Sequence, residues 1–277
     1  MSYSPPPNPF QSPQVPPQPY AAPQAEMKFS GQSKLEYMRA YNYIFENPNW
    51  MMNVLWGFLS MLVPIVGPLV FMGYEFEIVE SLLMNQGTRY PDFDLNRLSY
   101  YLERGIWPFL VNLVANFVMA PVFFVFYIGM MLLVAGGGAA GGEEAGAIIA
   151  LIMIPLMFIV IMGLVIVLTM FLLPMIIRAG LSQDFAQGFN FGWIMSFVKK
   201  MWAEMLLVTL FMSVSGLMLV FVGALIFCVG MYFAAVIVML ASTNFQYQLY
   251  RIFLTRGGEP IPLKPRLPPP QMMPANM

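Results

Sequence analysis

The sequence predicts an all-α polytopic membrane protein, built as a bundle of helical hairpins with four to six membrane helices. Hydrophobic residues make up 59% of the 277 residues and charged residues only 10%, whereas a soluble domain carries about 25% charged residues. Four apolar blocks, at residues 50–74, 106–134, 147–174 and 205–242, are each long enough to enter the bilayer. All 13 lysines and arginines lie outside these blocks.

The positions of the basic residues predict how the blocks are threaded. The five segments outside the blocks hold, in order, three, three, none, three and four basic residues. If every block crossed once, the two sides of the membrane would carry seven and six. If the first and last blocks are hairpins, all 13 lie on one side, and residues 135–146, which have none, lie on the other. The positive-inside rule favours this second arrangement. We therefore predict three helical hairpins with both termini cytosolic.

The first block contains the turn that this threading requires, in the stretch "SMLVPIVGPLVFMGYEFEIVESLL" at residues 60–83. Pro64 and Pro68 interrupt a helix, and Gly67 tolerates backbone conformations that a Cβ resists. The arm at residues 51–63 would rise only about 20 Å at helical pitch. The sequence therefore leaves open whether this first hairpin spans the bilayer or is re-entrant. The last block, by contrast, has room for two spans on either side of Gly223.

An amphipathic segment precedes each predicted hairpin, beginning at Tyr41, Phe93 and Phe189. The second and third align without gaps, and each unit places a tryptophan where the chain would meet the bilayer, as interfacial anchoring requires. We therefore expect three copies of an interfacial helix followed by a hairpin. The glycine-rich residues 135–146 are expected to form a flexible linker.

Two proline-rich tails are expected to flank the membrane domain. Residues 1–32 are predicted to be a disordered cytosolic tail, residues 33–256 the helical membrane domain, and residues 257–277 a second proline-rich tail. Proline fixes φ and removes a backbone donor, so such tails are extended. Disorder alone explains this composition, although a protein partner that binds proline-rich ligands is the alternative.

Composition also excludes much familiar chemistry. The chain has no histidine and one cysteine, Cys228, which excludes intrachain disulfides, metal sites based on His or Cys, and His-dependent triads. We see no catalytic constellation, and we expect no catalytic residue, cofactor or metal, and no enzymatic activity. The net charge of −1 gives no reason to expect a nucleic-acid partner. The partner that composition does imply is the lipid bilayer.

Glu75, Asn112 and Asn116 are the candidates for a polar site within the membrane. A carboxylate deep in hydrocarbon costs about 2.5–3.5 kcal/mol and often marks an ion or proton path. Glu77 and Glu80 are more simply interpreted as the solvated face of an emerging helix. Asn112 and Asn116 are four residues apart and share a helical face, which hydrogen bonding between helices would explain.

The stretch "VPIVGPLVFMGYEFEIVESLLMNQGTRYPDFD", residues 63–94, resembles the uncharacterised prokaryotic membrane family known as domain of unknown function 4013. The residues that carry the resemblance are Pro64, Gly67, Pro68, Gly73, Tyr74, Pro91, Phe93 and Asp94. Where members of the family often carry basic residues after the Gly-Tyr pair, this chain has glutamates. The resemblance implies a multi-pass protein of the prokaryotic cytoplasmic membrane, and it implies no assigned activity.

Two functions follow from these observations. The first is a non-enzymatic integral membrane protein that organises partners or lipid through its interfacial helices and proline-rich tails. The alternative is a small transporter or channel component that uses Glu75 on its permeation path. Transport requires polar residues converging from several spans, and the predicted spans contain few of them. The first function is therefore favoured, although the sequence names no substrate, lipid, partner or oligomeric state.

Overall fold

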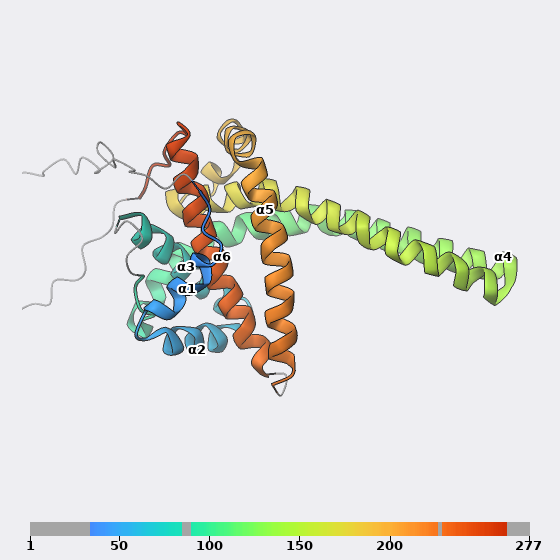
Figure 1. Cartoon of the computed structure of the whole chain (residues 1–277). Coiled ribbons are helices and arrows are strands. Elements are labelled where there is room, and N and C mark those ends of the chain that lie inside the picture. The colour runs from blue at the N-terminus through green and yellow to red at the C-terminus, as the bar shows by residue number, and fades with distance from the viewer. Residues whose placement is uncertain (1–33, 85–89, 227–228, 265–277) are drawn as a thin grey trace, which may run out of the picture. The chain divides into compact units, whose positions relative to one another are not determined.

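The computed structural model describes residues 34–84, 90–226 and 229–264, and within them all regular structure is helical, as predicted (Figure 1). The elements are α1 (Arg39–Glu46), α2 (Trp50–Met61), α3 (Val66–Met84), η1 (Leu95–Arg97), α4 (Leu98–Ser182), η2 (Ala186–Phe189), α5 (Phe191–Ala224) and α6 (Val229–Thr255).

Four helical segments in the described part of the chain are long and apolar enough to cross a membrane. They are Leu95–Gly137, Gly146–Ser182, Phe191–Ala224 and Val229–Thr255. The first consists of η1 and the outgoing arm of α4, the second is the returning arm of α4, and the others coincide with α5 and α6. The number lies within the predicted four to six, and these segments account for three of the four apolar blocks.

The α4 helix is itself a hairpin of two long arms, which lie side by side in Figure 1. Between the arms, only Gly142 departs from helical geometry, with φ 81° and ψ 177°. This extended conformation with positive φ is adopted almost exclusively by glycine. At the base of the hairpin, the Gln183 side chain donates a hydrogen bond to the Arg104 carbonyl at 3.3 Å. The expectation that residues 135–146 form a linker is therefore wrong, because both arms are helical up to this one residue.

A second hairpin joins α5 to α6, as predicted for the last apolar block. Near its turn the two backbones touch, since a Cβ added to Gly223 would lie 2.5 Å from the carbonyl oxygen of Gly230. Glycine is therefore required there for close approach. Residues 227–228, including Cys228, lie outside the described residues.

The predicted turn in the first block lies between α2 and α3. Pro64 is in the turn itself, and Ile65 adopts a left-handed φ of 67°. Gly67 and Pro68 lie in the first turn of α3, where a Cβ on Gly67 would lie 1.5 Å from the Ser60 carbonyl oxygen. This glycine is therefore needed for close approach to α2, whereas we expected it to supply an unusual backbone conformation.

The α2 helix is too short to cross a bilayer. Its 12 residues rise about 18 Å, against a hydrocarbon core of about 30 Å. The α3 helix is buried along most of its length inside the protein. The first hairpin is thus a packed element that does not span by itself.

The core forms where α3 lies against the first turns of α4. A Cβ on Gly73 would lie 1.9 Å from the Tyr101 carbonyl oxygen, and one on Gly105 would lie 1.9 Å from the Leu69 carbonyl oxygen. Rings fill the space beside this contact, with Tyr74 and Tyr101 centroids 5.8 Å apart. The two helices therefore meet backbone to backbone, and this contact brings the glutamates of α3 close to α4.

The amphipathic segments that begin at Phe93 and Phe189 lead into the first turns of α4 and α5 and are continuous with the spans that follow. Their aromatic residues Tyr101 and Phe197 are fully buried in protein. The predicted tail at residues 1–32 lies outside the described residues. The first part of the other tail, up to residue 264, packs on α6, where the Ile261 N–H donates to the Tyr250 hydroxyl at 2.7 Å.

Candidate functional site

The glutamates of α3 point into the protein. Glu77 forms an ion pair with Arg97 at 2.6 Å, and Glu80 forms one with Arg104. Both carboxylates are buried. The interpretation of Glu77 and Glu80 as a solvated helix face is therefore wrong. A buried carboxylate requires a partner, and here arginines of η1 and α4 provide it.

Glu75 differs from the other two glutamates because its contact is a neutral hydroxyl. The Thr243 Oγ1 donates to the Glu75 carboxylate at 3.1 Å, and the residue is only 7% exposed. Among the described residues Glu75 forms no ion pair. Burial raises the pKa of Glu75, which lies on α3 outside the four span-length segments, to about 8, although the Thr243 hydrogen bond lowers it in part. The carboxyl is therefore mostly protonated at neutral pH.

The arginines at the base of the α4 hairpin are also enclosed in protein. Arg104 donates to the Tyr100 hydroxyl at 2.7 Å in addition to pairing with Glu80. On the returning arm, Arg178 donates to the Gln187 side chain at 2.9 Å and lies over the Trp193 ring at 5.0 Å. These groups anchor the hairpin to α3 and α5, which is a structural role.

A hydrogen-bond network around Asp92 was not predicted from the sequence. The side-chain amides of Asn47, Asn49 and Asn53 donate to the Asp92 carboxylate at 2.8, 2.7 and 3.4 Å. The Phe93 N–H in turn donates to the Asn53 side chain at 2.9 Å. This network ties α1 and α2 to the segment before α4. The signal in the sequence is the Pro-Asp-Phe-Asp motif at residues 91–94, which contains Asp92.

Asn112 and Asn116 lie together on the first arm of α4, and their surroundings differ from those of Glu75. The Asn116 Nδ2 donates to the Asn112 side-chain oxygen at 2.5 Å and to its carbonyl at 2.8 Å. The expected shared face is present, and the hydrogen bonds run within one helix. Glu75 is in the core while this pair is on an exposed arm, so the three predicted polar residues do not form one site.

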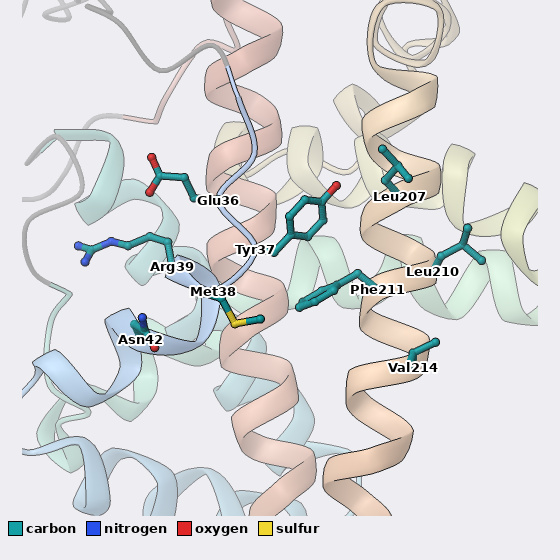
Figure 2. Close-up of a pocket in the computed structure, with 9 residues that line it drawn as sticks. All are labelled: Glu36, Tyr37, Met38, Arg39, Asn42, Leu207, Leu210, Phe211 and Val214. Atoms are coloured by element: carbon teal, nitrogen blue, oxygen red, sulfur yellow. The ribbon is translucent and has the colours of Figure 1, made fainter.

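A groove of about 1070 Å³ opens between α5 and residues 36–42 (Figure 2). Figure 2 shows Tyr37 and Met38 directed toward α5, with Glu36 and Arg39 on the opposite side of the segment. The Tyr37 and Phe211 ring centroids lie 4.9 Å apart at its floor. The lining residues are Glu36, Tyr37, Met38, Arg39, Asn42, Leu207, Leu210, Phe211 and Val214. None of the predicted site residues lines this groove.

The described residues offer no acidic, histidine or cysteine cluster of three that could hold a metal ion. The fold thus defines a class: an all-α protein whose four long apolar segments fit an integral membrane protein. The family model described as "Protein of unknown function (DUF4013)" matches residues 56–228, more than half of the chain, so the chain belongs to this family. The resemblance seen in residues 63–94 is thereby confirmed. No curated protein and no solved structure matches the chain.

Proposed function

We propose that this protein is a non-enzymatic integral membrane protein whose role is structural, holding partners or lipid through its exposed helices. The observation that carries the proposal is the α4 hairpin. Its apolar side chains beyond the base are exposed along both arms, with Phe117 81% exposed. A continuous apolar surface of this kind suits lipid and other membrane helices.

The charged groups of the core support a structural role. Glu77 and Glu80 are held by arginines, and Asp92 accepts hydrogen bonds from three asparagines. Such groups fix helices relative to one another. A permeation path would instead require polar groups that converge on an accessible cavity. The groove beside α5 is largely apolar and does not include Glu75.

The alternative, a transporter or channel component, is favoured by one feature: the buried Glu75 forms no ion pair among the residues that the structure describes. Acidic residues take part in the proton relays of membrane pumps and transporters. In both versions we expect the two termini on the cytosolic side, because the hairpin threading puts all 13 basic residues on one side of the membrane. A prokaryotic cytoplasmic membrane is what the family resemblance implies. The proline-rich tails would then be available to a cytosolic protein partner.

Photocrosslinking in native membranes tests the proposal. A photoreactive residue in place of Phe117 on α4 is expected to give protein adducts of defined mass. The matched control is Phe221 on α5, which is 67% exposed and is expected to give mainly lipid adducts. Proteoliposomes with wild-type protein or Glu75→Gln should show the same solute and ion flux as empty vesicles. Lipid-only adducts at Phe117, together with a flux that Glu75→Gln abolishes, would favour the transporter instead.

A further inference from the structure

The groove between α5 and residues 36–42 has apolar walls. On the α5 side, Leu207 and Val214 are 52% and 62% exposed. Tyr37 and Met38 form the facing wall (Figure 2). The volume of about 1070 Å³ is that of a large ligand-binding cleft. Because α5 is one of the span-length segments, the molecules available to fill such a groove in a membrane are lipids.

The groove lies just inside the predicted cytosolic boundary of the last apolar block. That block begins at Met205, and Lys199 and Lys200 precede it on the cytosolic side. Leu207 and Val214 are about 3 Å and 14 Å further along the helix than Met205. The first part of a lipid chain occupies this depth, and its headgroup lies outside it. A lipid of the cytosolic leaflet would therefore enter the groove at the Leu207 end.

Two polar groups stand at that end of the groove. Figure 2 shows the Tyr37 hydroxyl on the Leu207 side, and it forms no hydrogen bond with the residues that the structure describes. Lys200 lies seven residues before Leu207, so it projects from nearly the same face of α5, about 10 Å further toward the cytosol. Its ammonium donates to the carbonyls of Arg256 and Gly257 at 3.0 and 2.6 Å. An ammonium has three donors, so one remains for a ligand.

The charge of Lys200 is not cancelled locally. It forms no ion pair with a described residue. The carboxylate of Glu204, which lies between Lys200 and Leu207 on α5, is instead neutralised by an ion pair with Arg256. Basic pockets between helices on the cytoplasmic side of a membrane bind anionic headgroups. The cytosolic end of the groove is therefore complementary to a phosphate.

We propose that this groove binds one anionic phospholipid of the cytosolic leaflet. One hydrocarbon chain lies against Met38 and the apolar side chains of α5. The Tyr37 hydroxyl donates to an oxygen near the lipid backbone, and Lys200 binds the phosphate. This inference names a lipid that the protein holds and so rests on the proposed function.

Native mass spectrometry of the full chain in detergent tests the headgroup contact. Titration with phosphatidylglycerol should give one saturable lipid adduct, bound more tightly than phosphatidylcholine with the same chains. Lys200→Gln keeps amide donors for the two carbonyls, and it should raise the dissociation constant for phosphatidylglycerol roughly fivefold without changing that for phosphatidylcholine. Lys199→Gln is the matched control, because Lys199 is exposed and points about 100° away around the helix. Equal effects of the two variants, or no preference in the wild type, would overturn the inference.

The same titration tests the chain contact. Val214→Trp should fill the groove and weaken binding of both lipids. Ser213→Trp should not, because Ser213 is an exposed neighbour turned about 100° away from Val214. Both positions are exposed, so both variants are expected to keep the wild-type Tm. Tyr37→Phe should weaken both lipids roughly fivefold, as the loss of one hydrogen bond does.

The inference is overturned if the wild type shows no saturable lipid adduct, or if Val214→Trp binds lipid as Ser213→Trp does. If that occurs while Phe117 gives protein adducts, the proposed function still stands. Saturable binding together with a flux that Glu75→Gln abolishes would keep the lipid site and remove the proposed function.

Discussion

Replacement of Glu80 by leucine should strongly destabilise the protein. Glu80 and Arg104 are 3% and 5% exposed and form the ion pair that joins α3 to α4. Leucine leaves the Arg104 guanidinium in the core, where the Tyr100 hydroxyl is its remaining side-chain hydrogen-bond partner among the described residues. The Arg104 Nε already has no partner among them. Removing one member of a buried pair costs about 3–5 kcal/mol.

The expected size of the effect can be stated for thermal unfolding in detergent. For a chain of this size, each kcal/mol corresponds to about 2–4 °C in Tm, so Glu80→Leu should lower Tm by roughly 6–20 °C. The double variant Glu80→Leu/Arg104→Met removes both charges and should recover most of that loss, because apolar replacement of a buried pair is often neutral or stabilising.

The exposed pair between Glu103 and Lys264 provides the control. These side chains are 62% and 51% exposed, with 3.1 Å between Oε1 and Nζ. Glu103→Gln should therefore cost less than about 1 kcal/mol. The reasoning is refuted if Glu80→Leu is no more harmful than Glu103→Gln, or if the double variant is as unstable as Glu80→Leu alone.

Three further predictions concern the contact between α3 and α4, the carboxyl group of Glu75 and the membrane topology. Gly73→Ala should prevent normal packing and lower Tm sharply, because the added Cβ would lie 1.9 Å from the Tyr101 carbonyl oxygen. Gly192→Ala is the control and should be tolerated, because its Cβ would lie 3.6 Å from its nearest neighbour. Equal Tm values for the two variants would contradict the close contact between α3 and α4. Glu75 keeps its proton up to a pH of about 8 in the fold but only to about 4.3 when unfolded, so wild-type stability should fall as pH rises through this window. Glu75→Gln cannot lose a proton, and its Tm advantage over wild type should grow between pH 5 and 8; a constant difference would argue against a shifted carboxyl. Single cysteines at positions 28 and 97, in a Cys228→Ala background, should be labelled from the cytosolic face only, and labelling from opposite faces would defeat the predicted threading.

The sequence alone determined the all-α class and the last hairpin, because both depend on local properties. A run of apolar residues must satisfy its own backbone hydrogen bonds in a membrane, which restricts it to helices. The length of the last block required two spans, and the fold has them in α5 and α6. Asn112 and Asn116 were placed on one face because helical spacing fixes that relation. The family was visible in the motif of residues 63–94, and the family model confirms it.

The same local reasoning failed at residues 135–146, where glycine content suggested a linker. Helix continues through most of this segment, and the chain reverses at Gly142. Glycine composition is a weak guide there, since glycine lowers helix stability by only about 1 kcal/mol per residue relative to alanine and does not forbid a helix.

Only the tertiary structure decided what the acidic residues do. Glu77 and Arg97 are 20 positions apart, and Glu80 and Arg104 are 24 apart, so no helical periodicity relates them. Their pairing depends on the backbone contact of α3 with α4 at Gly73 and Gly105. Likewise, Glu75 meets Thr243 across 168 positions. The residues that pack around a carboxylate decide its ion pairs and hydrogen bonds. Those residues come from segments far apart in the chain, and a sequence pattern describes only one segment.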